Sequence, residues 1–441
     1  MEGTVGHLVG KDIYRELGRK IDHLATRVPW NDTLHEILQE LYSREEADLI
    51  VRMPHGLSTL NRVERITGFD RSRLEHLLDG LCDKGLVIDV EIHGKYRYAV
   101  SPLVVGIFEF TMMRGGNHID RKKIAGLFHQ YMGPDGVFHA ANFGHGESTS
   151  IMRSLPHEGT IREDEFVEVL DYEKARDIIN GANRFSMGIC SCRHEKHHLG
   201  MKKCEAAMDN CSSFGMAADY LIRHDLAREV SKEEMLDNVE QSRELGLVMN
   251  ADNVQRNVGF ICHCCGCCCN VLAGLTDHGY TATVLTSSYI ARSNDEVCMG
   301  CNHCEKACPI DAISMVADPD PATRRRKKPE IDKDFCLGCG VCATACTTGA
   351  MKLDERDQRV IPPESTFQKV ILSALDRGTL QYQLFDNPNS GSQAFLRGLV
   401  GGFLNLPPVK RALLSKQLRS RFLETMESGI RKQGKSWATE V

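Results

Sequence analysis

The chain has 441 residues, of which 42% are hydrophobic and 26% charged, a balance typical of a soluble globular protein with roughly two to four domains. The formal net charge of -6 gives no general attraction to nucleic acid. Cysteine is the unusual residue, because the chain contains 19 and they are bunched. No apolar signal segment opens the sequence and no apolar run is long enough to cross a bilayer. We therefore expect a cytoplasmic protein whose thiols bind metal and do not form disulfides.

The first third of the chain predicts helices followed by a β-hairpin. An N-terminal helical segment over residues 1–30 precedes a region whose order of elements is that of a winged-helix-like domain, residues 31–102. Asp70 is a plausible N-cap for the last helix of this domain, and the hairpin is expected to turn near Gly94. The hydrophobic pattern predicts helices over 32–53, 58–68 and 70–85 and a hairpin over 86–100.

The charges of the candidate recognition helix, residues 70–85, argue against DNA reading. Acidic residues outnumber basic ones in this stretch, whereas helices that enter a phosphate-lined groove generally carry a basic excess. A module for packing or partner docking is therefore the preferred interpretation. The alternative is a redox-sensing transcriptional regulator in which the winged helix binds DNA. The connecting region that follows, residues 103–185, contains no recognisable site.

Two cysteine runs with the spacing CxxCxxCxxxC repeat each other at an offset of 38 residues, from Cys298 to Cys336. A tight loop of this kind lets thiolates and backbone N–H groups converge on a cluster. Over residues 290–355 the chain resembles the bacterial-type 2[4Fe-4S] ferredoxin domain, although Thr347 stands where a proline often follows the last cysteine. The resemblance implies that one cluster takes Cys298, Cys301, Cys304 and Cys346, and that the second takes Cys336, Cys339, Cys342 and Cys308.

A second cysteine-rich region over residues 186–289 holds ten further thiols. One tetrahedral zinc or one cubane uses four, so a single ordinary site leaves six unexplained. Three interpretations stay open: two further [4Fe-4S] clusters, one cubane with a structural zinc, or a larger non-standard iron–sulfur assembly. A helix opened by Ser231 and Glu234 is expected to separate the two halves of the region. The ten candidate ligands are Cys190, Cys192, Cys204, Cys211, Cys262, Cys264, Cys265, Cys267, Cys268 and Cys269.

Basic and imidazole side chains surround these thiols in the sequence. The histidines nearest to the cysteines are not expected to be ligands, because a histidine beside a thiolate cluster is more often a hydrogen-bond donor or simply exposed. The basic residues either offset the negative charge of a cluster or belong to a solvated loop. The histidines are His194, His197, His198 and His263, and the basic residues are Arg193, Lys196, Lys202 and Lys203.

Three basic or glycine-rich stretches carry weaker signals. The stretch GIRKQGKS, residues 429–436, matches the phosphate-loop pattern, but a helical pattern precedes it where a strand would be needed. The run RRRKK, residues 324–328, is either a solvated loop or a surface that steers an acidic partner. Residues 356–441 are expected to form a helical tail, in which residues 410–441 carry eight basic and three acidic side chains. This basic stretch is either a solvated surface or a docking site for an acidic partner.

Together these patterns predict a multidomain α+β protein with a winged-helix-like domain, a cysteine-rich α/β region, a dicluster ferredoxin domain and a helical tail. The order of the two cysteine regions resembles a group of multi-cluster ferredoxin-type proteins of anaerobic microbes. That resemblance implies iron–sulfur binding and electron transfer to or from a partner oxidoreductase or carrier. The cysteine count predicts, beside the two [4Fe-4S] clusters, one or two additional iron–sulfur clusters or a zinc ion. The sequence shows no acid–base pair or nucleophile, so the chain is interpreted as a component of an oxidoreductase system. The alternative is an iron–sulfur enzyme whose substrate binds a cluster in the 190–269 region.

Overall fold

The computed structural model describes residues 12–115, 119–162, 169–319 and 325–440, which fall into two compact units. The first unit comprises the described residues up to Glu147 together with Val370–Glu440, and the second comprises those of Ser148–Lys369. Both units combine helices with β-sheets. Among the described residues, none of the helices has both the length and the apolar composition that a membrane-spanning segment requires.

The N-terminal part of the first unit combines short helices with a three-stranded antiparallel sheet of order β1-β3-β2. As predicted, the Asp70 side chain caps α5 by accepting hydrogen bonds from the backbone N–H groups of Ser72 and Arg73. The hairpin turns at Gly94, whose φ is +71°. The elements in chain order are α1 (Ile13–Asp22), α2 (Asp32–Leu41), α3 (Arg44–Arg52), β1 (Ser58–Thr59), α4 (Leu60–Thr67), α5 (Arg71–Asp83), β2 (Val87–Ile92) and β3 (Lys95–Val100).

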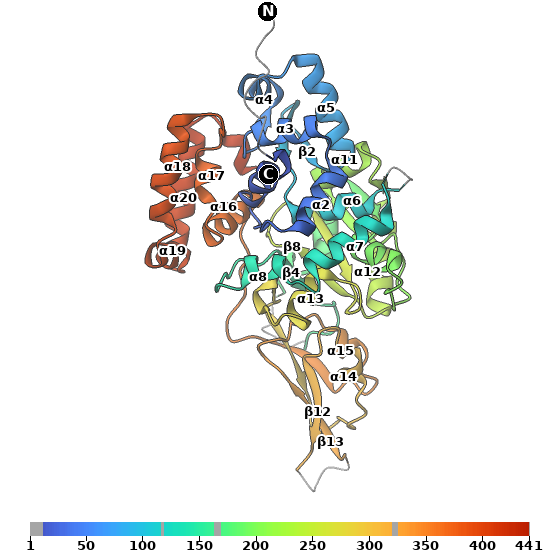
Figure 1. The fold of residues 1–441 in the computed structure, drawn as a ribbon. Helices are drawn as coiled ribbons and strands as arrows, with labels where there is room; N and C mark the ends of the chain where they lie inside the picture. The colour runs from blue at the N-terminus through green and yellow to red at the C-terminus, as the bar shows by residue number, and fades with distance from the viewer. Residues whose placement is uncertain (1–11, 116–118, 163–168, 320–324, 441) are drawn as a thin grey trace, which may run out of the picture. The chain divides into compact units, whose positions relative to one another are not determined.

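Helices form most of the rest of the first unit, and α17 to α20 lie together at the red end of the chain in Figure 1. The Arg62 guanidinium forms two hydrogen bonds of 2.9 and 2.7 Å with the Asp386 carboxylate, so the link between α17 and α18 is fastened to α4. The helices are α6 (Phe108–Met113), α7 (Arg121–Met132), α8 (Val137–Phe143), α16 (Thr366–Asp376), α17 (Leu380–Leu384), α18 (Gly391–Leu404), α19 (Pro407–Leu414) and α20 (Arg419–Lys432).

A seven-stranded sheet of order β10-β4-β8-β9-β6-β5-β7 organises the second unit. Only the β10–β4 pair among these strands is parallel. Ile179 of α9 and Met235 of α12 pack with Met249 and Ile261 of the sheet, so these two helices cover one face. The strands are β4 (Met152–Leu155), β5 (Phe185–Gly188), β6 (Cys211–Phe214), β7 (Ala227–Glu229), β8 (Val248–Asp252), β9 (Phe260–Cys264) and β10 (Val284–Leu285).

In this sheet region the structure confirms the helix that the sequence predicted from its N-terminal cap. The Ser231 hydroxyl accepts a hydrogen bond from the backbone N–H of Glu234 and opens α12, which separates the two cysteine-bearing segments as expected. Two other helices begin directly after a cysteine, because Cys190 is the N-cap of α10 and Cys269 is the N-cap of α13. The helices are α9 (Ala175–Gly181), α10 (Ser191–His198), α11 (Gly215–Arg223), α12 (Lys232–Glu244) and α13 (Asn270–Thr276).

The region of the two repeated cysteine runs contains two antiparallel strand pairs and two short helices. The helices α14 and α15 lie side by side, and α14 also contacts the β12–β13 hairpin (Figure 1). Gly338 has φ +68°, and a Cβ atom there would lie 2.1 Å from the Tyr289 carbonyl oxygen, so only glycine fits this approach. The elements are β11 (Tyr289–Ser293), α14 (His303–Ala307), β12 (Ile313–Ala317), β13 (Lys327–Ile331), α15 (Val341–Thr344) and β14 (Met351–Glu355).

Candidate metal centres

Antiparallel pairing brings the distant cysteines of the second unit to one edge of the seven-stranded sheet. The last residue of β5, Gly188, pairs with Cys211, the first residue of β6. In the next pair, Ser212 of β6 lies opposite Ile261 of β9. The end of β5, the start of β6 and the end of β9 therefore share an edge. Thiols separated by more than fifty residues in the chain meet there.

Six thiols at this edge form a connected set, which we call the six-thiol group. The Sγ atoms of Cys269 and Cys264 lie 3.4 Å apart. Cys262 hydrogen-bonds with Cys211 and Cys264, and Cys192 hydrogen-bonds with Cys269. Hydrogen bonds from Cys262 and Cys269 lower the pKa of the Cys264 thiol to about 6 in spite of its burial. Burial raises the pKa of the Cys190 thiol and the charges of Cys192 and Cys211 add to the effect, so Cys190 lies near the same set. The group consists of Cys190, Cys192, Cys211, Cys262, Cys264 and Cys269.

The other four thiols form a tighter cluster, which we call the four-thiol group. Cys265, Cys267 and Cys268 lie in the turn after β9, and Cys204 comes from the segment between α10 and β6. The four Sγ atoms all lie within 4.8 Å of one another. The Sγ atoms of Cys204 and Cys265 are 3.4 Å apart, as are those of Cys267 and Cys268. The ten thiols of the region thus divide into a group of six and a group of four.

Arg193 is fully buried between the two groups. Its guanidinium donates hydrogen bonds to the side chain of Asn210 and the backbone carbonyl of His263, and it also hydrogen-bonds with Cys265. The charges of Cys190 and Cys264 act on the same guanidinium. A buried cation is stable only when hydrogen-bond acceptors or negative charges surround it. The thiols and the acceptors beside them provide that surrounding for Arg193.

The interpretation of the basic residues as a solvated loop is therefore wrong for Arg193. It is also wrong for Lys196, which is 7% exposed and whose ammonium lies 2.8 Å from the buried Glu195 carboxylate. The same ammonium donates a 3.0 Å hydrogen bond to Asn270, the first residue of α13. Lys203, in contrast, is exposed. Positive charge near the thiols therefore comes from the helix α10 and also from Lys202 of the loop after it, whose ammonium donates a hydrogen bond to the Cys204 carbonyl.

The histidines near the thiols occupy different positions. His263 lies between Cys262 and Cys264 in β9, so strand alternation directs its side chain to the opposite face of the sheet. There its Nε2 lies 2.9 Å from the Ser212 hydroxyl, and burial lowers its pKa to about 3. His194 and His198 of α10 contact each other, with 2.9 Å between their Nε2 atoms.

The structure brings thiols of the two repeated cysteine runs together. Four thiols, those of Cys308, Cys336, Cys339 and Cys342, line one cavity. Burial raises the pKa of Cys304, and the neighbouring thiols of Cys298 and Cys346 act in the same direction. Cys304 therefore lies near Cys298 and Cys346, which belong to the same predicted ligand set as Cys304. The apolar walls of the cavity consist of Ala291, Ile310, Ala312, Ile313, Leu337 and Leu353.

This cavity suits an iron–sulfur cubane in its donor set and its walls. Thiolates are the ligands that such clusters take, and an apolar surround excludes water from them. Burial raises the pKa of Cys339 to about 12, and the nearby Cys336 and Cys308 add to the effect. Bringing these thiols together as metal-free thiolates is thus unfavourable, whereas binding to iron would stabilise their deprotonated form.

The two cysteine regions touch through their backbones. Gly266 lies between Cys265 and Cys267, and a Cβ atom at this position would lie 2.4 Å from the carbonyl oxygen of Pro309. Pro309 directly follows Cys308. The turn that carries most of the four-thiol group therefore packs against the peptide next to a predicted ligand of the dicluster region.

A segment of the connecting region, residues 157–162, also belongs to this contact, which the sequence did not indicate. The backbone N–H of His157 donates a 2.9 Å hydrogen bond to the Cys339 carbonyl, and its Nε2 lies 2.8 Å from the Leu247 carbonyl. Leu247 packs against Cys265 and Cys268. Nothing in a lone histidine signals such a role, because its partners are backbone atoms far away in the sequence.

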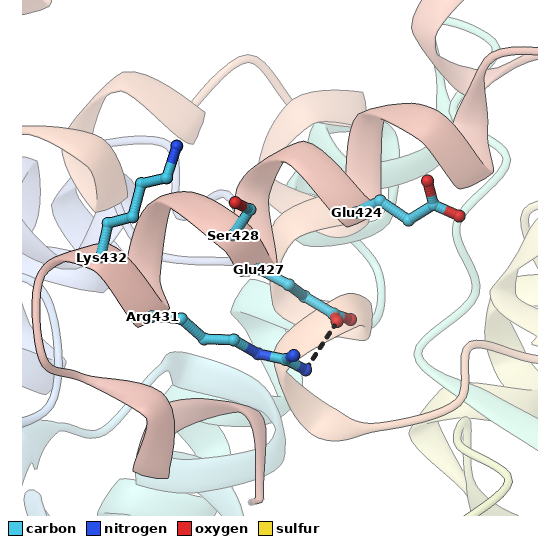
Figure 2. Close-up of a pocket in the computed structure, with 5 residues that line it drawn as sticks. All are labelled: Glu424, Glu427, Ser428, Arg431 and Lys432. Atoms are coloured by element: carbon cyan, nitrogen blue, oxygen red, sulfur yellow. Dashed lines mark ion pairs between the residues drawn. The ribbon is translucent and has the colours of Figure 1, made fainter.

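The structure bears differently on the phosphate-loop-like stretch and on the run RRRKK. Gly429 lies inside helix α20, so no strand precedes the phosphate-loop-like stretch. The open pocket on this helix is lined by α20 alone, and Figure 2 shows its Glu427–Arg431 ion pair at 3.5 Å. Within the run RRRKK, Arg324 lies outside the described residues. Arg325 is buried and pairs with Asp318 at 2.5 Å, which excludes it from steering a partner. Arg326 and Lys327 are exposed, so steering of an acidic partner stays a prediction for these two residues.

Comparison with known proteins agrees with this geometry in one region. Residues 297–350 match the family model described as a 4Fe-4S dicluster domain. Searches of the curated proteins and of the solved structures found no match. The chain is accordingly an iron–sulfur protein with a dicluster ferredoxin domain, a kind of domain that serves electron transfer in general.

Proposed function

We propose that this protein relays electrons through several iron–sulfur clusters to or from a partner oxidoreductase. The contact between Gly266 and Pro309 carries the proposal, because it joins the second cysteine region to the dicluster domain at backbone distance. Electron tunnelling weakens steeply with distance, so a direct contact of this kind favours transfer between the two regions. The clusters would supply the one-electron chemistry, and the chain would supply their spacing, surroundings and docking surface.

The exposure of the predicted ligands supports an order for the relay. Cys301 is exposed, and its neighbour Met299 is 64% exposed, so the ligand set that includes Cys301 lies at the surface. Cys336 and Cys342 are buried. We infer that a partner docks at the outer set, and that the inner set stands between it and the six-thiol group.

The ligand assignment within this relay follows the crossed pattern of two-cluster ferredoxins. The proximity of Cys304 to Cys346, and of Cys339 to Cys308, supports that crossing. In the proposed assignment the outer set is Cys298, Cys301, Cys304 and Cys346, and the inner set is Cys336, Cys339, Cys342 and Cys308. The six-thiol group would hold one additional cluster.

Substituting Gly266 with alanine tests the relay. The added methyl group would collide with the Pro309 carbonyl and force the two regions apart. We expect a loss of roughly 1–3 kcal/mol in stability, as for other overpacked sites, and slower reduction of the six-thiol cluster by a small protein electron donor. Rapid-freeze EPR spectroscopy under anaerobic conditions measures that reduction separately from reduction of the dicluster domain.

Gly181→Ala is the matched control, because a Cβ atom at Gly181 meets no other atom within 4 Å. This control should reduce at the wild-type rate. If Gly266→Ala also reduces the six-thiol cluster at the wild-type rate, the contact is not the path, and the proposed relay is wrong.

The N-terminal region is proposed to be a winged-helix-like docking module. The order α3, β1, α4, α5, β2, β3 supports the winged-helix interpretation. The basic side chains of α5 are occupied: Arg71 pairs with Glu75 at 2.7 Å, and Arg73 pairs with Glu45. Side chains already paired with carboxylates are poorly suited to phosphate contacts.

We therefore expect no specific DNA binding by the anaerobically purified protein in either redox state. Any residual affinity should be no tighter than the roughly 10⁻⁴–10⁻⁶ M of non-specific binding at physiological salt. Fluorescence anisotropy with a pool of labelled duplexes measures it. Nanomolar binding that weakens steeply with salt would instead support the alternative function, a redox-sensing transcriptional regulator.

A further inference from the structure

Among the described residues, the four-thiol group is the one set of four thiols that is compact throughout, whereas the six-thiol group has a 3.4 Å contact between Cys264 and Cys269 but no such set of four. All four Sγ atoms lie within 4.8 Å of one another, and two pairs are separated by 3.4 Å. Four thiols of the dicluster domain, those of the inner set, instead surround a cavity. In a cubane each iron takes one thiolate, so the four ligand sulfurs lie spread around the outside of the cluster.

Four thiolates that share one ion lie much closer together. Zinc binds cysteine sulfur at about 2.3 Å in a tetrahedron, which places neighbouring sulfurs about 3.8 Å apart. The separation of 3.7 Å between the Sγ atoms of Cys267 and Cys265 agrees with that value. Zinc has no geometric preference from its d electrons, so it tolerates ligands from one short turn and one distant segment.

We propose that Cys204, Cys265, Cys267 and Cys268 bind a single zinc ion, which is redox-silent and structural. Four thiolates around Zn²⁺ leave two negative charges, and the buried Arg193 guanidinium, hydrogen-bonded to Cys265, offsets part of that charge. Ala206 and Leu247 pack against the group and limit the access of water.

The position of the group shows what the zinc would hold. Cys204 belongs to the segment between α10 and β6, whereas the other three ligands belong to the turn after β9. An ion shared by both segments fixes the turn, and the turn carries Gly266, which abuts Pro309. The zinc would thus hold the sheet region against the dicluster domain. This inference goes beyond the proposed relay, since it assigns a metal that carries no electrons.

The test is zinc and iron analysis of the full chain, purified without oxygen and passed over a chelating resin. We expect about one zinc per chain in the wild type. In Cys204→Ser and in Cys267→Ser the zinc should fall to background while the iron stays at the wild-type level. Lys203→Ala is the control, because this exposed side chain lies next to Cys204 and carries no thiol, so the variant should leave both metals unchanged.

Substitution of cobalt for zinc provides a measurement that does not depend on the folding of a variant. The wild type produced with Co²⁺ should show the intense thiolate-to-cobalt absorption of a tetrahedral four-sulfur site. A wild type without zinc, or variants that lose iron and keep zinc, would overturn the proposal. Because iron and zinc are measured in the same sample, failure of the zinc site is distinguishable from failure of the relay.

Discussion

Replacing Cys262, Cys264 and Cys269 with serine is expected to remove about four iron atoms per chain and to leave about eight in place. The three residues belong to the six-thiol group, in which Cys264 and Cys269 are in direct contact. Their loss leaves three thiols, fewer than the four that a cubane requires. The iron of the dicluster domain should persist, because none of its predicted ligands is changed.

Iron and acid-labile sulfide determinations on anaerobic protein measure this change, and EPR spectroscopy of the reduced protein should lose one signal. The matched control is Cys204→Ser, which removes a neighbouring thiol that belongs to the four-thiol group. Its iron content should equal that of the wild type. If the triple variant keeps all of its iron, the six-thiol group holds no cluster, and the relay would end within the dicluster domain.

Replacing Arg193 with methionine is expected to lower stability by about 3–5 kcal/mol, the usual cost of breaking a fully buried charge pair from one side. The substitution leaves the Asn210 side chain and the His263 carbonyl without their donor, and removes the buried positive charge beside the thiols. For a unit of this size the loss corresponds to a decrease in Tm of roughly 6–20 °C. The clusters should also become harder to reduce.

Anaerobic thermal unfolding and EPR-monitored redox titration measure these two effects. Arg193→Lys retains the charge but loses the planar arrangement of donors of the guanidinium. Its Tm and its cluster reduction potentials should therefore lie between those of Arg193→Met and the wild type. Lys203→Met is the control for charge alone, since Lys203 lies ten residues further along and is exposed. Its Tm should stay within the range of ordinary surface substitutions. Equal changes in Tm and in reduction potential for the Arg193 and Lys203 variants would show that both quantities depend only on net charge.

The contrast between Arg193 and Lys203 shows why the sequence could not assign these basic residues. Both lie near cysteines in a polar stretch, and hydropathy gives no reason to bury one and expose the other. The difference arises because Arg193 is on α10, which begins at the sheet edge where the thiols meet, whereas Lys203 follows the helix. A buried cation is stable here only because distant residues provide its partners.

Local features were predictable because their physical causes lie within a few residues. The cap of α5 at Asp70 and the cap of α12 at Ser231 depend on contacts over two or three residues. The same holds for the CxxCxxCxxxC runs, whose spacing brings thiols together within one loop, and the family match covers that region.

The sequence by itself therefore determined that this is an iron–sulfur protein with a dicluster domain and ten thiols in a second cysteine-rich region. Only the tertiary structure decided how the ten thiols divide, because that depends on the pairing of β5, β6 and β9 and on the turn after β9. It also placed Gly266 against Pro309, although the two are far apart in the chain. Adjacent letters in CHCCGCCC fall into different groups, since strand alternation and the following turn direct neighbouring side chains to different places.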